Sequence, residues 1–298
     1  MKMDRDSKPD SAPRPDRAAG ADRPATADEA NFDNELKLLL EAIYFRYQHD
    51  FRHYAVASLR RRIEQAMHQY ACRSVSQLQD RVLHEPDVFA GILSYLTVQV
   101  SEMFRDPPYF RALRSEVVPV LKTYPSVKVW IAGCSSGEEV WSLAILLAEE
   151  GVLDRTLIYA SDINPEALKK AEGGVYALDR VALFSSNYLA AGGSGSLSDH
   201  YHAAYDGVVF DRRFRQHMLF TDHSLATDTV FSEVHLVSCR NVLIYFDRPL
   251  QDRAVGLFRE ALVRRGFLGV GAKESLRLTS HAAAFEEIRG TQRLYRKC

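Results

Sequence analysis

The sequence predicts an α/β fold in which a mostly parallel sheet follows an N-terminal helical domain and carries a small antiparallel insertion. Two strand–turn–helix units, at 127–150 and 156–176, predict the sheet, because such alternation is typical of parallel strands. Helical periodicity between about Phe32 and Val100 predicts the first domain. Glycine-rich sequence after Leu189 breaks the alternation and predicts the insertion.

The N-terminal segments differ sharply in apolar content. Residues 1–31 mix Asp, Arg, Pro and Ala with almost no large apolar side chain, so we expect a disordered tail that cannot repay the entropy of ordering. Residues 32–100 instead show two apolar helical faces, one with Leu36, Leu39, Leu40, Ile43 and Tyr44 and the other with Leu59, Ile63 and Met67. We expect a small helical bundle there.

The first unit of the sheet joins an apolar strand to a glycine turn and a helix. The apolar run ends at Ala132, and Gly133–Gly137 is too small and turn-prone to continue a strand. A helix is expected to begin near Glu138, where its first backbone N–H groups are free to meet a ligand. This arrangement is typical of a nucleotide pocket.

The second unit places an acid at the tip of its strand. Asp162 follows the strand Leu157–Ala160, roughly 20 or more residues past the glycine turn, where an acid can accept hydrogen bonds from ribose hydroxyls. The turn is G-C-S-S-G and lacks the G-x-G-x-x-G pattern that meets a pyrophosphate. These features favour S-adenosylmethionine over NAD. A purely structural strand–turn–helix unit would show them too, so other motifs must decide.

The rest of the chain completes the sheet and supplies the insertion. Residues 190–200 have the composition of a flexible loop, and Tyr201–Phe220 resembles hairpin sequence with Asp206–Gly207 as its turn. We therefore expect a small β-subdomain at about 190–220. Later strands of the sheet are expected near Met218–Phe220, Val234–Ser238 and Phe267–Gly271.

Composition excludes several classes of protein. A formal net charge of -1 gives no basic excess for nucleic acid, and 46% hydrophobic residues are enough for one large core and a smaller one. No apolar run reaches the ~20 residues that span a bilayer, so we expect no membrane insertion. No metal site is predicted, and a reducing cytoplasm is expected, because the four cysteines are widely spaced without a C-x-x-C pair: Cys72, Cys134, Cys239 and Cys298.

Four motifs resemble those of the chemotaxis receptor glutamate O-methyltransferases of the CheR type. They occur in the family's order and are SEMFRDP at Ser101–Pro107, AGCSSGEEVWSLA at Ala132–Ala144, SDINPEALKKAEGGVY at Ser161–Tyr176 and CRNVLIYFD at Cys239–Asp247. The similarity extends from about Asn34 to Lys297. It implies a Rossmann-like S-adenosylmethionine-dependent methyltransferase domain at 101–298 and a substrate-recognition domain at 32–100, with S-adenosylhomocysteine as the product of the cofactor.

The resemblance also assigns site residues one by one. On the acceptor side, Arg105 would orient a carboxylate and Tyr245 would donate a hydrogen bond to it. The residues implied for the cofactor are Gln99, Ser101 and Arg105 near its methionyl part, Gly133 in the turn, Glu138 or Glu139 at its amino group, Asp162 at the ribose, and Ser224, Leu225, Asn241 and Val242 around the adenine. Taken alone, the two glutamates would equally stabilise a helix N-terminus, and Asn241 would equally satisfy a turn.

Several positions depart from the family's pattern. Ser224 replaces a usual Asn, Ser136 a usual Thr and Val140–Trp141 a usual Pro–Tyr, while Gln99 and Ser101 stand where Asn and Thr are usual. Glu102 is the largest departure, because many members carry a small neutral residue there. It would repel an anionic substrate, pair with Arg105 or point outward, and we expect the last.

The chemistry implied by the resemblance suits the residues present. A glutamate carboxylate has a reference pKa of about 4.3 and is already ionised at pH 7, so methylation needs positioning and no general base. The chain indeed shows no obvious nucleophile–base constellation. The resemblance implies a cytoplasmic enzyme that forms glutamate methyl esters on a chemoreceptor-like signalling protein. A non-catalytic signalling protein that senses S-adenosylmethionine is the alternative, and the extra helical domain disfavours a small-molecule substrate.

Two surfaces would meet the receptor. Acidic methylation helices would face Arg60, Arg61 and Arg62, with Arg52 and Arg73 nearby, although most runs of charge are only solvated faces. In some members of the family the β-subdomain docks the receptor's C-terminal tail. An ordinary surface hairpin would show the same sequence.

Overall fold

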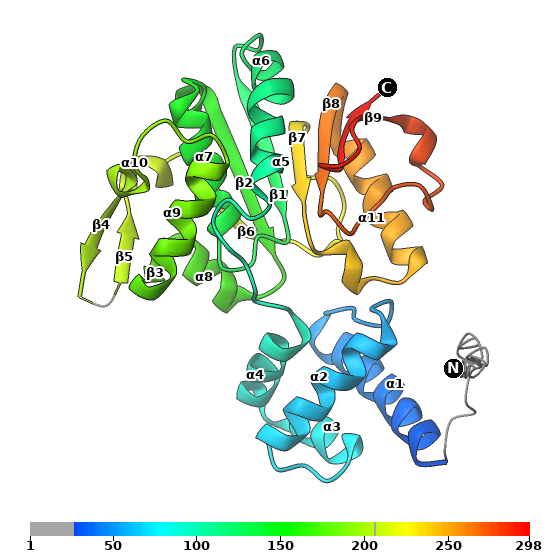
Figure 1. The fold of residues 1–298 in the computed structure, drawn as a ribbon. Helices are drawn as coiled ribbons and strands as arrows, with labels where there is room; N and C mark the ends of the chain where they lie inside the picture. Colours follow the sequence, from blue (N-terminus) through cyan, green and yellow to red (C-terminus); the bar gives the residue numbers. More distant parts are fainter. Residues whose placement is uncertain (1–26, 206) are drawn as a thin grey trace, which may run out of the picture.

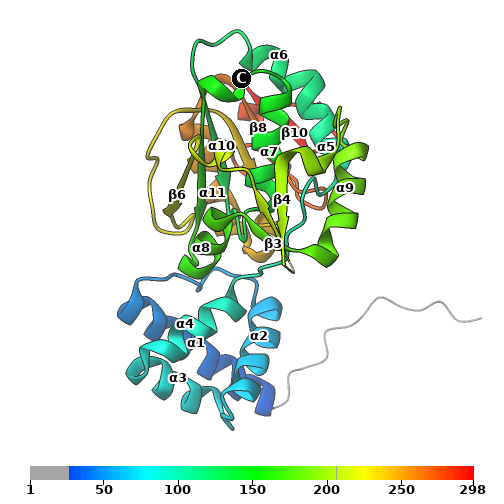
Figure 2. The ribbon, with the colours of Figure 1, turned by 90° about the vertical axis from the view of Figure 1, so that its left-hand side faces the viewer.

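The computed structural model describes residues 27–205 and 207–298. The predicted fold class is confirmed: a seven-stranded, mostly parallel sheet follows a helical domain, and a separate three-stranded antiparallel sheet is present. Figure 1 shows the N-terminal helices, in blue and cyan, as a body beneath the sheet domain. Figure 2 shows the same two bodies from the side. No helix in the described ranges is long and apolar enough to span a bilayer.

The main sheet has the order β6-β2-β1-β7-β8-β10-β9. Its parallel strands include all those that the sequence predicted, whereas the antiparallel pair β9 and β10 was not predicted. The order reverses beside β1, since the chain first extends through β2 and β6 and then returns through β7 and β8. The strands are β1 (Val127–Ala132), β2 (Thr156–Asp162), β6 (Met218–Asp222), β7 (Val234–Cys239), β8 (Leu262–Val270), β9 (Phe285–Arg289) and β10 (Leu294–Lys297).

Strand β1 is buried on both faces, which explains its nearly continuous apolar run. Val129 and Ile131 belong to the core on one face, and Trp130 and Ala132 belong to the core on the other. The first core includes residues of α5 (Pro107–Ala112), α6 (Val118–Leu121), α7 (Glu138–Glu149) and α9 (Val181–Ala190), and the second those of α11 (Arg248–Ala261). The sheet domain is therefore three-layered.

The small sheet has the order β3-β5-β4 and extends beyond the expected range of about 190–220. It contains β3 (Val175–Ala177), β4 (Tyr201–Ala204) and β5 (Gly207–Phe210), and α10 (Arg212–Arg215) follows. β3 lies earlier in the chain than expected, and β6 pairs with β2 in the main sheet instead. Asp206 of the predicted turn lies outside the described residues.

Four helices build the N-terminal domain around one apolar core, as predicted. They are α1 (Ala27–Tyr47), α2 (Val56–Gln69), α3 (Val75–His84) and α4 (Pro86–Leu96). The Ser74 hydroxyl accepts a hydrogen bond from Gln77 N–H and so caps α3, and Pro86 opens α4 at a position that needs no N–H donor. Residues 27–31 are helical, although they fall in the expected disordered tail, and 1–26 lie outside the described residues.

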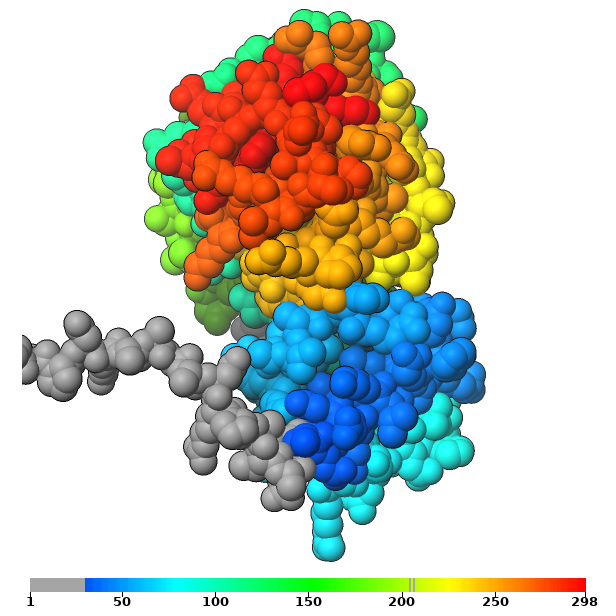
Figure 3. Space-filling model, turned by 90° about the vertical axis from the view of Figure 1, so that its right-hand side faces the viewer, coloured from blue at the N-terminus to red at the C-terminus, as the bar shows by residue number. Residues whose placement is uncertain are grey.

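The helical domain packs against the loop between β7 and α11. The Ala55 N–H donates to the Tyr245 carbonyl at 2.8 Å, and the Asp247 N–H donates to the His53 carbonyl at 2.8 Å. The ring of Tyr54 meets that of Phe246 edge-on, with centroids 5.0 Å apart. Figure 3 shows this contact as blue atoms of the helical domain against yellow-orange atoms of the sheet domain.

Arg62 was expected on an exposed basic face, but it is buried inside this contact between the domains. Its Nη1 donates to the Leu96 carbonyl at 2.6 Å, and its guanidinium carbon lies 4.7 Å from the centre of the Tyr245 ring. Burial lowers its pKa. Arg60 is half-buried and pairs with Asp33 at 2.6 Å, so Arg61 is the most exposed of the three arginines. A helix displays consecutive residues in different directions, so a run of three cannot share one face.

Gly174 ends α8 (Pro165–Gly173), as the sequence predicted, and permits a close contact. It has φ +60°, and an added Cβ would lie 2.4 Å from Cζ2 of the buried Trp141. The Trp141 indole also donates to the Ala171 carbonyl at 2.9 Å, which fixes the ring against this helix. Gly151 after α7 has φ +68° with nothing within 4 Å of its added Cβ.

We predict that Gly174→Ala lowers the free energy of unfolding more than Gly151→Ala does. Each substitution costs about 1–2 kcal/mol of folding free energy, because alanine replaces glycine in the left-handed region. Only Gly174→Ala must also displace Trp141, which adds about 1–3 kcal/mol of overpacking. Urea unfolding of both variants measures the difference, and equal losses would contradict the proposed contact.

Candidate cofactor-binding and active site

A pocket opens at the carboxyl ends of β1, β2 and β7, beside the point where the strand order reverses. Ligands of open α/β sheets bind at such switch points. It contains about 930 Å³ of empty space, its opening to solvent included, and Tyr54 of the helical domain forms part of its wall. The other walls come from residues 96–101, 131–135, 162–163 and 240–242, together with Arg105, Glu139, His223, Leu225, Ser238, Tyr245 and Phe246.

Asp162 holds the turn that forms the floor of the pocket. Its Oδ2 accepts the Ser135 N–H at 2.8 Å, and its Oδ1 accepts the Asn164 N–H at 3.0 Å. Burial raises the pKa of Asp162, and these N–H groups act in the opposite direction. Each carboxylate oxygen has two acceptor sites, so Asp162 can also accept from a pair of hydroxyls.

The turn approaches the opposite wall because Gly133 has no side chain. Gly133 has φ +74°, and an added Cβ would lie 2.5 Å from Cγ2 of Val242. Ser135 has φ +51°, which is unfavourable for a residue other than glycine. The Ser135 N–H donates to Asp162, and the Ser135 hydroxyl donates to Oε1 of Gln99 at 2.9 Å. The turn is therefore fixed from two sides.

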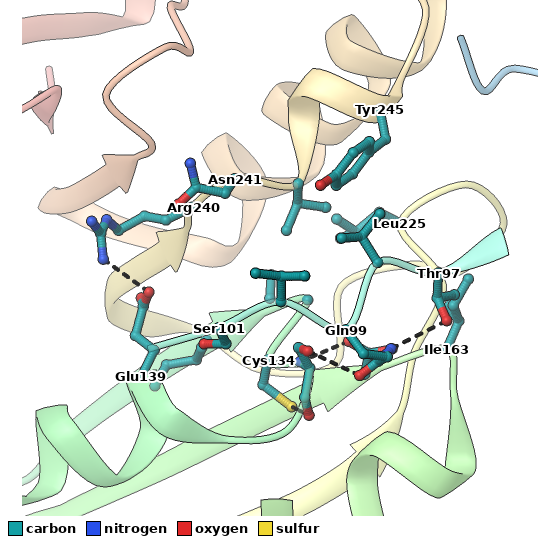
Figure 4. Close-up of a pocket in the computed structure, with 18 of the residues that line it drawn as sticks. Thr97, Gln99, Ser101, Cys134, Glu139, Ile163, Leu225, Arg240, Asn241 and Tyr245 are labelled. Atoms are coloured by element: carbon teal, nitrogen blue, oxygen red, sulfur yellow. Dashed lines mark hydrogen bonds and ion pairs between the residues drawn. The ribbon is translucent and has the colours of Figure 1, made fainter. Parts of the chain in front are cut away.

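Gln99 connects the turn to the linker between the domains. Its Nε2 donates to the Thr97 hydroxyl at 3.1 Å, and Nδ2 of Asn164 donates to the same hydroxyl at 2.9 Å. Figure 4 shows Gln99 between Thr97 and the turn, with the bond from Gln99 to Thr97 dashed. Gln99 thus lines the pocket, and its contact with the cofactor stays a prediction, while the roles of Thr97 and Asn164 were not foreseen.

Glu139 and Glu138 have different surroundings. Glu139 lines the pocket, where it accepts from the Ser238 hydroxyl at 2.5 Å and from Nη1 of Arg240 at 3.0 Å. Glu138 is fully buried outside the pocket and accepts from Nη1 of Arg180 and the Ser136 hydroxyl, each at 2.7 Å. Successive helical side chains point in different directions, so the two acids cannot share one ligand.

Arg240 is a buried cation at the end of β7 that the sequence analysis did not single out. Its Nη2 donates to Asp106 at 2.8 Å and to the carbonyl of Arg105 at 2.9 Å, and its guanidinium carbon lies 4.2 Å from the centre of the Tyr109 ring. Burial opposes the charge, yet Glu139 and Asp106 raise the pKa of Arg240 overall. Arg240 thus anchors both Glu139 and the backbone of Arg105.

The two residues expected on the acceptor side both line the pocket. Arg105 is half-buried, and its Nη1 donates to the Val100 carbonyl at 3.3 Å. Tyr245 lies across the pocket from Glu139 in Figure 4. Glu102 is not part of the lining, and no ion pair joins it to Arg105.

Of the remaining residues predicted to bind the cofactor, four line the pocket and one does not. Ser101, Leu225, Asn241 and Val242 line the pocket, but Ser224 does not. Its N–H donates to Asp228 at 2.9 Å, and its hydroxyl accepts from Ala226 N–H, so Ser224 closes a turn. Further lining residues that the sequence analysis missed include Tyr54, Thr97, Ser135, His223, Ser238 and Arg240.

A sequence signal existed for some of these. Arg240 lies within the Cys239–Asp247 motif, Ser238 directly precedes that motif, and Ser135 lies within the glycine turn. Tyr54 had none, because it reaches the pocket through the contact between domains. In the part of the chain that the structure describes, no three His, Cys, Asp or Glu residues gather to hold a metal ion.

The residues present fit S-adenosylmethionine. Asp162 offers a carboxylate where a ribose is expected, Glu139 offers a second at the other end of the turn, and Leu225 and Val242 offer apolar surface for a base. A pocket with apolar walls and a few fixed polar groups is typical of cofactor sites.

Comparisons with known proteins agree. The family model "CheR methyltransferase, SAM binding domain" matches residues 99–294, and "CheR methyltransferase, all-alpha domain" matches residues 34–97. A Pseudomonas putida protein named "Putative methyltransferase Cher3" is 55% identical over 90% of this chain and 98% of its own length. "Chemotaxis protein methyltransferase 2" of Pseudomonas aeruginosa is 32% identical over 66% of this chain and 70% of its own length.

A "Chemotaxis protein methyltransferase" of Listeria monocytogenes is 32% identical over 62% of this chain and 68% of its own length. The solved N-methyltransferase NodS from Bradyrhizobium japonicum gives a TM-score of 0.39 with 12% identity over 66% of this chain and 89% of that chain, which adds nothing to the assignment. The two family models together span both domains of the structure. This chain belongs to the CheR methyltransferase family and has its S-adenosylmethionine-binding domain.

Proposed function

We propose that this protein transfers the methyl group of S-adenosylmethionine to glutamate side chains of a chemoreceptor-like signalling protein, forming glutamate methyl esters. One observation carries the proposal: a single pocket brings Asp162 and Glu139 together with Arg105 and Tyr245 in a chain of the CheR family. The names of the relatives, chemotaxis protein methyltransferases, support a receptor as the substrate.

Different residues on the cofactor side of the pocket would bind different parts of S-adenosylmethionine. S-adenosylmethionine supplies an electrophilic methyl group on a sulfonium when bound. Asp162 would accept from the ribose hydroxyls and Glu139 from the amino group, because both carboxylates line the pocket with fixed partners. Gln99 and Ser101 would meet the methionyl part, and Gly133, Leu225, Asn241 and Val242 would surround the rest.

The acceptor side needs to orient a carboxylate and remove water from it. Arg105 would hold the glutamate, since a guanidinium keeps its charge and offers paired donors. Tyr245 would donate a hydrogen bond from another side of the pocket. No base is required, because the carboxylate oxygen is already ionised, so the rate gain would come from proximity and alignment.

Two outer surfaces would recognise the receptor. Arg61 on α2 is exposed, so it can attract an acidic methylation helix. β3 and β4 are the edges of the small sheet, and an edge strand can pair with an extended peptide such as a receptor tail. The proposal places the protein in the cytoplasm, and its four cysteines, all free thiols, are compatible with that compartment.

Binding of S-adenosylhomocysteine, measured by calorimetry, tests the cofactor side. Asp162→Ala should weaken it by about 10- to 100-fold, because hydrogen bonds to a charged group are lost. Asp154→Ala, at an exposed site away from the pocket, should have no effect, and NAD should not bind. Unchanged affinity in folded Asp162→Ala would refute the ribose assignment. No binding by the wild-type protein would refute cofactor use.

Methyl transfer to a receptor fragment tests the reaction itself. With methyl-labelled S-adenosylmethionine, the wild-type protein should produce a base-labile ester label on glutamates. Arg105→Lys should lower kcat/KM by roughly tenfold or more, because lysine lacks the paired donors that hold a carboxylate. Arg111→Lys, which is exposed and outside the pocket, is the control. Cofactor binding without any label would favour the non-catalytic sensor instead.

Charge reversal on α2 tests receptor recognition. Arg61→Glu should raise KM for the receptor severalfold, with a smaller effect at high salt, because an exposed charge acts through long-range attraction. Affinity for S-adenosylhomocysteine should stay the same, since Arg61 does not line the pocket. Arg264→Glu, exposed on β8, is the matched control. The same KM for both variants and the wild type would remove Arg61 from the recognition surface.

A further inference from the structure

Glu274, on the loop after β8, is a buried carboxylate that the proposed reaction does not use. It is 4% exposed, and no ion pair with a cation is found for it among the described residues. Its Oε2 accepts the N–H groups of Asn241 at 3.0 Å and Gly271 at 2.5 Å, and its Oε1 accepts that of Ile244 at 3.2 Å. Backbone N–H groups alone therefore satisfy this carboxylate.

Two of these donors belong to the loop that forms one wall of the pocket. Residues 240–247 connect β7 to α11, and the stretch 241–245 of this loop brings Asn241, Val242 and Tyr245 to the pocket. Asn241 has φ +61°, in the left-handed region, which asparagine tolerates better than most residues but which still favours glycine. Glu274 accepts the N–H of this residue and so stabilises the conformation directly.

Gly271 allows the two loops to come this close. An added Cβ would lie 2.7 Å from Oε2 of Glu274 and 2.8 Å from the Asn241 nitrogen. The Glu274 N–H in turn donates to the Gly271 carbonyl at 2.8 Å, which closes a tight turn around the carboxylate. Both loops are therefore built around one side chain.

The carboxylate is the chemical form that suits this position. Burial raises the pKa of Glu274, and the surrounding N–H groups oppose that shift. An ionised carboxylate accepts on both oxygens, whereas the amide of a glutamine has one accepting oxygen and one donating nitrogen. A glutamine would leave at least one buried N–H facing another donor.

We propose that Glu274 is a positioning residue whose carboxylate holds the 241–245 loop so that Asn241 and Val242 meet the cofactor and Tyr245 meets the acceptor. The inference rests on the proposed function of the pocket. It assigns no contact between Glu274 and either ligand. Its effect passes through backbone bonds to the loop.

Hydrogen exchange of the full-length protein without ligand tests the positioning. In Glu274→Gln, the amide of Asn241 or that of Ile244 should exchange roughly tenfold faster or more, because the single accepting oxygen of a glutamine leaves one of the two sides without an acceptor. Amides of β1 should keep their protection, which separates local release of the loop from general destabilisation. Glu286→Gln, at an exposed site on β9, is the matched control.

Calorimetry with S-adenosylhomocysteine gives the functional result. Glu274→Gln should bind roughly tenfold more weakly than the wild type and Glu286→Gln should not change, because the loop must be ordered again on binding. Unchanged exchange at Asn241 and Ile244, or unchanged affinity, would overturn the inference while the proposed function stands. Failure of the wild type to bind would overturn the proposed function, and hydrogen exchange would still decide whether Glu274 holds the loop.

Discussion

The pocket depends on buried carboxylates that accept hydrogen bonds from the backbone of the loops around it. Asp162 at the end of β2 takes the N–H groups of Ser135 and Asn164, and this fixes the glycine turn after β1. A buried N–H without a partner costs about 1–3 kcal/mol, so each such bond restricts where a loop can lie. Glu274 does the same for the loop after β7.

The two sides of the pocket are built in different ways. The cofactor side lies at the ends of packed parallel strands, and the turn approaches Val242 because Gly133 has no side chain. The proposed acceptor side lies where the domains meet: the carbonyl of Tyr245 accepts from Ala55 N–H, and the Tyr245 ring packs against Arg62 of α2. The domain proposed to recognise the receptor therefore also supports the tyrosine proposed to meet the methyl acceptor.

Local patterns predicted the parts of the fold that local forces decide. Apolar periodicity and the placement of glycines predicted strand β1, the glycine turn and the position of Asp162. The strands β9 and β10, near the C-terminus, pair antiparallel at one edge of the sheet, and their sequences show no clear strand pattern. Adjacent Glu138 and Glu139 could not be told apart until the direction of α7 was known. Glu274 and Arg240 act only because distant loops converge, which spacing along the chain cannot show.

A crystal structure of the protein with S-adenosylhomocysteine would test the central claim most directly. The account predicts that the ribose hydroxyls donate to Asp162 while its bonds to Ser135 and Asn164 persist, and that the turn at Gly133 stays where it is. Pre-formed sites of this kind move little on binding. A ribose bound away from Asp162, or a turn that rearranges to admit the ligand, would contradict it.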